Sequence, residues 1–147
     1  MTAVHQNDRL RAMLQKLRQC GMRITPQRTE IIKIMLEVPT HPSVDTVFQR
    51  VRQTHPSISL ATVYTTLDTL ARVGVLQEVA GTGERRFDGY NRSPHGHLVC
   101  RCCGAVEDME LPPQLDGFFT KVHDFQAESL QLTLTGICAA CRDQDGL

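Results

Sequence analysis

The sequence predicts an α+β protein with a helical first part and a β-rich second part. Between residues 10 and 74, apolar side chains recur at helical spacing in several segments, whereas later apolar residues alternate with polar ones. A chain of 147 residues, 41% of them hydrophobic, is long enough for two small domains. We therefore expect domains at residues 1–86 and 95–147, joined by a hinge at 87–94.

Start and stop signals place four amphipathic helices in the first part. The first ends near Gly21, a residue suited to a helix C-terminus. The second begins at residues 25–26, with threonine as N-cap and proline at the first helical position. The third begins at about Ser43, and the fourth runs from about Ser59 to Gly74. This order predicts a helix-turn-helix arrangement.

Strand patterns follow the helices. Residues 75–80 and 84–88 read as two strands joined by a glycine-rich turn at 81–83, which is typical of a hairpin. Helices followed by a hairpin are the element order of a winged helix. Residues 91–94 are predicted to form a linker.

The second part is predicted to be a small α/β domain. Residues 97–99 and 105–109 can pair around a cysteine-containing turn. Apolar residues at 115, 118, 119 and 122 indicate a short helix, and alternating leucines over 130–134 indicate a half-buried strand.

Charge and cysteine content narrow the function. Residues 1–90 carry 12 Lys/Arg against 8 Asp/Glu, while residues 91–147 carry 4 against 8, so a net charge of zero hides a basic first part. This asymmetry favours a first domain that faces nucleic acid. Neither a secretory signal nor a membrane span is evident, so we expect a cytoplasmic protein without membrane partners. Six cysteines in a reducing compartment then indicate metal binding.

Two Cys-x-x-Cys pairs predict a structural zinc site. Cys100 and Cys103 form one pair, and Cys138 and Cys141 form the other. Two such turns supply four thiolates for one tetrahedral ion, which would stabilise a domain with a thin core. Redox-active dithiols and an iron–sulfur cluster are the alternatives for these four residues.

The other two cysteines have no clear function. Cys102 lies within the first pair but outside its spacing, and Cys20 is expected to be a small core residue of a helix.

Imidazoles and carboxylates indicate a second metal site. His95 and His97 lie two residues apart, so in a strand both side chains point to the same face. Asp88, Asp108 and His41 are further candidate ligands. This donor set suits Fe(II), Mn(II) or Zn(II), and it holds an ion more exchangeably than four thiolates do.

Taken together in their order, these motifs resemble the ferric uptake regulator family. The resemblance covers residues 9–141. It is carried by Arg23-Ile-Thr-Pro-Gln-Arg28, His41-Pro42, Ser59-Leu-Ala-Thr-Val-Tyr64, Gly74, Arg86-Phe-Asp88, His95-Gly-His97 and the two cysteine pairs.

The resemblance implies a homodimeric repressor that binds palindromic double-stranded DNA when its regulatory metal is present. Its first domain would be a winged helix-turn-helix with the helix from Ser59 reading DNA and residues 81–83 as the wing, and its second a dimerisation domain. The implied DNA contacts are Arg23, Arg28, Ser59, Ala61, Thr62, Tyr64, Thr65 and Arg85.

Within the family, the ligand types resemble those of the peroxide-sensing branch. His41, Asp88, His95, His97 and Asp108 match its regulatory site, with aspartate at both acidic positions. The resemblance implies Fe(II) or Mn(II) as the regulatory ion. It also implies that peroxide oxidises His41 or His95 of the Fe(II) form. A histidine that iron sensors carry before the second cysteine pair is absent, so a third metal site is not expected, although Glu107 is a possible substitute ligand.

Other functions remain as alternatives. An iron, manganese or zinc uptake regulator would sense metal level alone, and a thiol–disulfide switch could use the cysteine pairs. A zinc hydrolase or deaminase is disfavoured, because a four-thiolate site is closed and the deaminase His-x-Glu motif is missing. We therefore expect no enzyme, and no small-molecule substrate other than peroxide.

Overall fold

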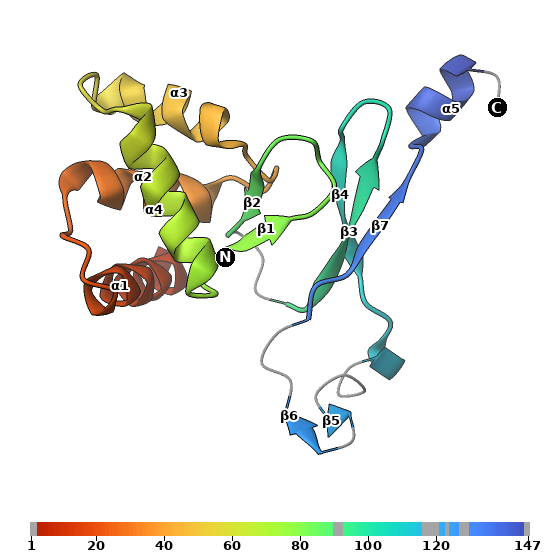
Figure 1. The fold of residues 1–147 in the computed structure, drawn as a ribbon, viewed down its shortest axis with the longest axis horizontal. Coiled ribbons are helices and arrows are strands. Elements are labelled where there is room, and N and C mark those ends of the chain that lie inside the picture. Colours follow the sequence, from red (N-terminus) through yellow and green to blue (C-terminus); the bar gives the residue numbers. More distant parts are fainter. Residues whose placement is uncertain (1–2, 90–92, 116–120, 123, 127–129, 146–147) are drawn as a thin grey trace. The chain divides into compact units, whose positions relative to one another are not determined.

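The computed structural model describes residues 3–89, 93–115, 121–122, 124–126 and 130–145 (Figure 1). The chain separates into two compact units. The first unit comprises Met1–Val79 and Glu84–Asn91, and the second comprises Ala80–Gly83 and Arg92–Leu147. Helices dominate the first unit and strands the second, which confirms the α+β class.

Three helices of the first unit begin where the sequence predicted. Thr25, Ser43 and Ser59 are N-caps, and each side-chain oxygen accepts a hydrogen bond from the backbone N–H three residues later. None of the helices in the described residues is long and apolar enough to cross a membrane. The helices are α1 (Ala3–Gln19), α2 (Pro26–Glu37), α3 (Val44–Thr54) and α4 (Leu60–Arg72).

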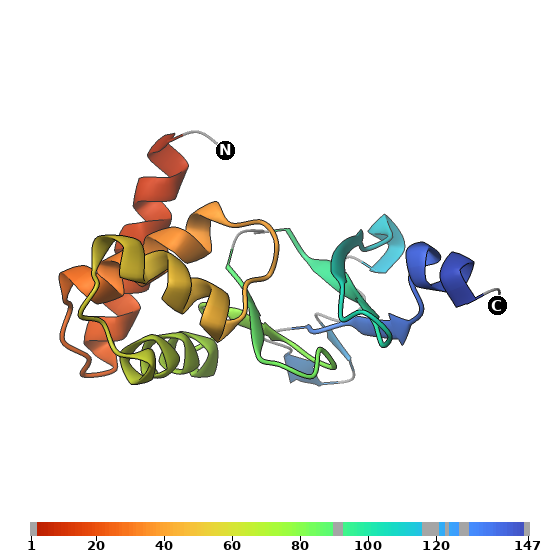
Figure 2. The same ribbon diagram turned by 90° about the horizontal axis from the view of Figure 1, so that it is seen from above.

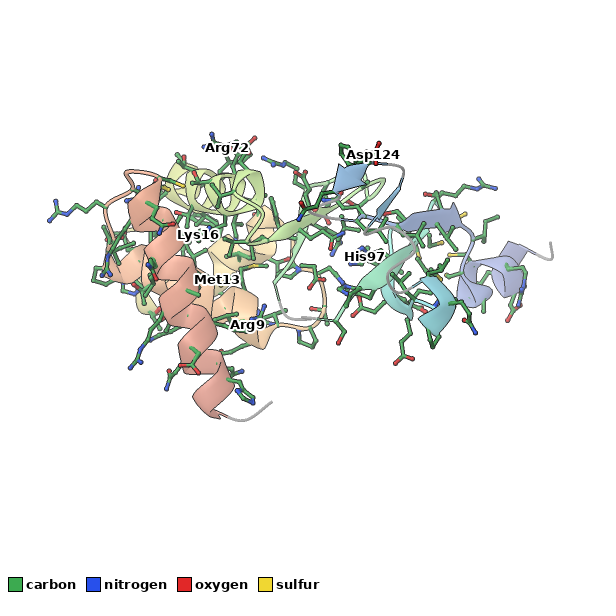
Figure 3. All side chains as sticks on the ribbon, turned by 90° about the horizontal axis from the view of Figure 1, so that it is seen from below. Arg9, Met13, Lys16, Arg72, His97 and Asp124 are labelled. Atoms are coloured by element: carbon green, nitrogen blue, oxygen red, sulfur yellow. The ribbon has the colours of Figure 1, made fainter. Side chains whose placement is uncertain are left out.

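One apolar core holds these helices together. Leu17, Ile31, Val47 and Leu67, one from each helix, have no exposed surface. Met13 of α1, labelled in Figure 3, packs into the same cluster. Burying an aliphatic side chain of this size contributes roughly 1.5–3 kcal/mol, so this core stabilises the helical unit.

A short antiparallel pair completes the first unit. Strand β1 (Gln77–Val79) pairs with β2 (Arg86–Asp88), with Glu78 opposite Phe87. Phe87 is fully buried in the helical core. The segment before α3 also pairs with β2, because Ser43 bridges Arg86. This pairing joins the strands to the helices at the end of the unit where the predicted ligands His41 and Asp88 lie.

These strands are shorter than the predicted ones at 75–80 and 84–88. The backbone N–H groups of Val75 and Leu76 both bond to the carbonyl of Leu70, and therefore they end α4 rather than extend β1. Gly81 and Gly83 in the connection have φ of 79° and 77°, which glycine adopts without strain.

The second unit is built on a three-stranded sheet in the order β4-β3-β7. Strand β3 (His95–Cys100) is central, antiparallel to β4 (Val106–Glu110) and parallel to β7 (Thr133–Gly136). The predicted strands at 97–99 and 105–109 are confirmed, with the cysteine-containing turn between them. Helix α5 (Ala139–Asp145) follows β7, as Figure 2 shows.

Two predictions for the second unit are wrong in part. A helix was predicted over residues 115–122. At its start the structure has a 3-10 turn, Pro113–Leu115. At its end it has strand β5 (Lys121–Val122), which pairs with β6 (Phe125–Gln126). Residues 116–120 lie outside the described part. The strand predicted over 130–134 forms later, as β7, because its register is set by pairing with β3. Of its three leucines, Leu132 is half-buried as predicted, whereas Leu130 is 39% and Leu134 50% exposed.

Candidate metal centres

The four predicted zinc cysteines converge in the second unit. Cys100 ends β3, Cys103 follows in the next turn, Cys138 precedes α5 and Cys141 lies in its first turn. Their sulfur atoms all lie within 4.8 Å of one another, and the Sγ atoms of Cys103 and Cys138 are 3.8 Å apart. The described cysteines form no disulfide. Four sulfur atoms at this spacing could all bind a single metal ion.

The backbone prepares one of these sulfurs to carry charge. Backbone N–H groups of Cys103 and Cys138 donate to Cys100 Sγ, the latter at 3.3 Å, and lower the pKa of the Cys100 thiol to about 6. The neighbouring thiols of Cys138 and Cys103 raise the pKa of Cys141 far above its ordinary value. A cation would replace the protons shared among these sulfurs, and four thiolates are a ligand set that suits structural Zn(II). The residues present therefore fit zinc.

Three of the predicted regulatory ligands meet across strands β3 and β4. His97 lies opposite Asp108 in the register, and His95 lies two residues before it on the same face. The Nε2 atoms of His95 and His97 lie 3.6 and 3.8 Å from Asp108 Oδ1. The imidazole rings are in edge contact, with centroids 4.8 Å apart. His97, labelled in Figure 3, is fully buried.

One imidazole of this group is held in a defined orientation. His95 Nδ1 lies 2.7 Å from the carbonyl oxygen of Ser93, which stabilises the tautomer protonated at Nδ1. The Nε2 lone pair then points toward Asp108. An N–H of a ligand histidine bonded to a carbonyl is the usual outer contact of metal sites. The chemistry of this trio suits a divalent cation.

The first unit brings together the other two predicted ligands. A ring nitrogen of His41 and a carboxylate oxygen of Asp88 lie within 4.8 Å of one another. His41 has φ of 49°, a left-handed backbone that is uncommon outside glycine. Arg86 Nη1 donates to the carbonyl of His41 at 3.3 Å, and Phe87 N–H donates to that of Pro42. The pairing with β2 therefore holds His41 in this conformation beside Asp88.

Glu107 lies on the other face of the sheet. It is opposite Leu98 in the register, whereas Asp108 is opposite His97. Strand alternation therefore separates the Glu107 carboxylate from the histidine face. In the described residues, Glu107 belongs to neither of the two groups of metal-ligating side chains.

The residues predicted to contact DNA lie mostly on the exposed side of α4 and its N-cap. Ser59, Ala61, Tyr64 and Thr65 are exposed, with Tyr64 at 47%, whereas Val63 on the opposite side is fully buried. Thr62 is half-buried and hydrogen-bonded to Ser59 through their hydroxyl groups. The structure therefore presents the start of α4 as a continuous outer surface.

The predicted basic contacts differ in their surroundings. Arg23 is exposed, and Arg28 is half-buried and donates to the carbonyl of Arg23. Arg85 is held by two acidic residues, Asp68 and Glu78. Sequence reasoning missed these two carboxylates. The one available signal was that Asp68 lies four residues after Tyr64, and hence on the same side of α4.

The prediction that Cys20 is a core residue is wrong. Helix α1 ends at Gln19, and Cys20 lies exposed in the following turn, with its N–H bonded to the carbonyl of Lys16. Met13 and Leu17 already supply the buried face of α1. Cys102 is also exposed, and His123 lies outside the described residues.

The model of the ferric uptake regulator family matches residues 19–135. The chain belongs to the ferric uptake regulator family. The peroxide-responsive repressor PerR of Staphylococcus aureus is 32% identical over 138 residues, covering 92% of this chain and 93% of the relative. The family membership makes the chain a metal-responsive regulator, consistent with the donor sets described above.

Solved ferric uptake regulators have the same fold. That of Helicobacter pylori superimposes with a TM-score of 0.76 at 19% identity, covering 93% of each chain. That of Vibrio cholerae gives a TM-score of 0.64 at 26% identity, covering 84% of this chain and 98% of the other. The predicted winged helix-turn-helix followed by a small dimerisation domain is therefore confirmed as the fold of this family member.

Proposed function

We propose that the protein is a metal-dependent DNA-binding repressor that responds to peroxide. This proposal depends on one observation: His95, His97 and Asp108 lie close together on one face of the β3–β4 pair. Imidazole and carboxylate donors of this kind bind Fe(II) or Mn(II) reversibly. The Cys₄ site, with its four thiolates, would hold zinc as a permanent structural ion.

The regulatory ion is proposed to bind all five predicted ligands. His41 and Asp88 belong to the first unit, whereas the trio of His95, His97 and Asp108 belongs to the second. A cation that recruits both sets would select one arrangement of the DNA-reading unit relative to the rest of the chain. Loss of the ion would release that arrangement; the hinge predicted at residues 87–94 lies partly outside the described residues. Operator affinity would then fall, because a two-fold operator presents its half-sites at a fixed spacing.

A homodimer is proposed to form through the second unit. Leu98 and Leu134 lie side by side in the β3–β7 register and are 37% and 50% exposed. Strand β7 is an edge of the three-stranded sheet. An apolar surface next to an open strand edge favours pairing with a second copy. Two copies would present two α4 helices to a palindromic operator, in the cytoplasm where the DNA is accessible.

Helix α4 is proposed to enter the major groove by its exposed start. Side chains at the N-terminal end of a recognition helix are the ones that reach base edges. Arg23 and Arg28 would neutralise phosphates and fix the register of the helix on the duplex. The proposed contacts on α4 and its N-cap are Ser59, Ala61, Thr62, Tyr64 and Thr65.

The response to peroxide is proposed to depend on iron. Held by these ligands, Fe(II) would supply the redox chemistry that activates peroxide, so that one peroxide oxygen would be added to the imidazole of His41 or His95 and the other released as water. The aspartates at positions 88 and 108 and the similarity to the Staphylococcus aureus PerR support this branch of the family. Oxidised imidazoles would no longer hold the ion, and repression would end.

The deciding experiment measures binding of the protein to a duplex that the Mn(II)-loaded protein has selected from random DNA. Separate samples carry Fe(II), Mn(II) or Zn(II), each with and without peroxide. We expect peroxide to abolish binding by the Fe(II) form alone, with mass spectrometry locating the added oxygen on His41 or His95. Unchanged binding by the peroxide-treated Fe(II) form would instead indicate a regulator of metal uptake. Oxygen confined to cysteine or methionine would also reject sensing through histidine.

A further inference from the structure

Arg85 joins the recognition helix to the β1–β2 pair in the first unit. Its Nε and Nη2 donate to the two carboxylate oxygens of Glu78 on β1, both at 2.8 Å. Its Nη1 donates to Asp68 Oδ1 on α4 at 3.0 Å. Two parallel bonds to one carboxylate and a third to another fix the plane of the guanidinium. This group therefore ties α4 to β1 by hydrogen bonds in a defined geometry.

The same guanidinium lies against two aromatic rings. Its central carbon is 5.1 Å from the ring centroid of Tyr64 on α4 and 5.2 Å from that of Phe87 on β2. Phe87 is fully buried, while Tyr64 is 47% exposed on the outer surface of the helix. Contacts of this length are within the range of cation–π attraction. Arg85 thus connects a buried core residue to the aromatic side chain proposed to reach DNA.

The charge of Arg85 is already compensated inside the unit. Asp68 and Glu78 together carry two negative charges, and Asp68 also pairs with Arg72 Nε at 3.2 Å. The hydrogen bond from Arg85 lowers the pKa of Glu78, so that carboxylate is ionised at neutral pH. To bind a phosphate, Arg85 would have to leave these partners, and Glu78 would lose its pairing with Arg85 while Asp68 kept only Arg72.

We propose that Arg85 is a positioning residue that orients Tyr64 and fixes α4 against β1, rather than a group that binds phosphate. This inference rests on the proposed DNA binding and revises one contact implied by the resemblance. It predicts that residues which never touch DNA, Glu78 and Asp68, control how the operator is read.

Glu78→Gln tests the proposal most sharply. This substitution removes a negative charge, so electrostatics alone would strengthen DNA binding, and a released phosphate-binding Arg85 would strengthen it further. If Arg85 instead acts as a clamp that holds α4 and Tyr64 in place, loss of its bonds to Glu78 predicts DNA binding about tenfold weaker, equivalent to 1.4 kcal/mol. The probe is the selected duplex, and the protein is the full chain loaded with Mn(II).

The double variant Arg85→Met with Glu78→Gln keeps the net charge of the wild-type chain. We expect it to bind as weakly as Glu78→Gln alone, with an unchanged slope of log affinity against log salt concentration. A phosphate contact predicts instead that the slope falls by about 1. A fall of that size, or tighter binding by Glu78→Gln, would overturn the proposal, as would wild-type affinity in both variants.

A measurement without DNA separates this inference from the function on which it rests. In the DNA-free protein, the Arg85 Nε–Hε group should give a slowly exchanging NMR signal that Glu78→Gln removes. If that signal is present but the wild-type protein selects no duplex, the proposed DNA-binding function is rejected, whereas the proposed role of Arg85 in holding α4 against β1 is retained. If the signal exchanges freely in the wild type, the clamp itself is refuted.

Discussion

Asp108 lies directly across the strand pair from His97, with its Oδ1 atom 3.8 Å from His97 Nε2. A fully buried imidazole and a carboxylate that is 37% exposed share this position. The side-chain oxygen reaches inward from the edge strand, whereas the ring comes from the central strand. The pair can therefore donate to one cation from two directions without any change of backbone.

His97→Ala tests the regulatory function of this pair. The substitution removes a central donor but keeps the Cys₄ site, so we expect metal-dependent DNA binding to be lost while zinc content and oligomeric state stay unchanged. Fluorescence anisotropy with the selected duplex, across Mn(II) concentrations, measures the effect. His5→Ala changes an exposed histidine on α1 and serves as the control. Wild-type Mn(II) dependence in His97→Ala would remove this residue from the site.

Cys138→Ser tests the zinc site. A metal bound by four thiolates contributes roughly 10–16 kcal/mol in zinc-finger peptides, more than a small sheet can supply by itself. We therefore expect Cys138→Ser to lose zinc and the folded second unit, as measured by elemental analysis and amide NMR spectra. Cys102→Ser, which alters an exposed cysteine between two ligands, should keep both. A folded, zinc-free Cys138→Ser protein would show that the site is dispensable.

The stability of the zinc-free protein should depend on pH in two directions. The folded pKa of Cys100, about 6, lies below that of an unfolded thiol, so the unfolded chain binds more protons and stability rises with pH above about 6. The folded pKa of Cys141 is raised, so above the unfolded thiol pKa of about 8.5 the folded state binds more protons and stability falls. Amide NMR spectra of the chelator-treated protein should therefore show the largest residual folded fraction of the second unit between these two pH values, and a monotonic change with pH would contradict this prediction.

Gly96→Ala should disturb the histidine face without changing a ligand. A Cβ at this position would lie 2.9 Å from Met109 Cε and 3.2 Å from the carbonyl oxygen of Leu132. That carbonyl accepts the N–H of His97 at 2.9 Å, so relief of the overlap shifts the ligand. We expect a loss of about 1–3 kcal/mol in stability, together with weaker Mn(II) binding, by calorimetry. Gly136→Ala meets nothing within 4 Å and is the matched control.

Tyr64→Ala should weaken operator binding about tenfold, or 1.4 kcal/mol, because it removes the exposed ring from the outer surface of α4. Zinc content and Mn(II) affinity should not change, since the residue belongs to neither metal-ligating group. Tyr64→Phe keeps the ring and its contact with Arg85, and therefore isolates the hydroxyl. Equal affinity in the wild type and Tyr64→Ala would exclude this side chain from the interface.

Local chemistry accounts for what could be predicted from the sequence. The N-caps Thr25, Ser43 and Ser59 act within one helical turn, so a single sequence reveals them. The paired spacing of the cysteines and the period-2 spacing of His95 and His97 similarly predicted which side chains lie together. Each of these features depends on neighbours only a few residues away.

Pairings between distant segments were not predictable in the same way. The register of β7 follows from its parallel pairing with β3, which residues 130–136 do not encode by themselves. Leu134 was predicted to lie on the buried side of a half-buried strand, but it is 50% exposed. Arg85 looked like a phosphate contact because its partners Asp68 and Glu78 come from other elements, 17 and 7 residues away.

Strand β3 begins with His95 and ends with Cys100, so six consecutive residues carry ligands of both metal centres. If zinc is held at Cys100 as proposed, its loss is expected to disturb the strand that carries His95 and His97. A cell starved of zinc would thus lose its response to iron or manganese although every imidazole was intact. Under this proposal, zinc would be required for the response to the regulatory metal, and an assay that removes both metals could not distinguish loss of zinc from loss of the regulatory ion.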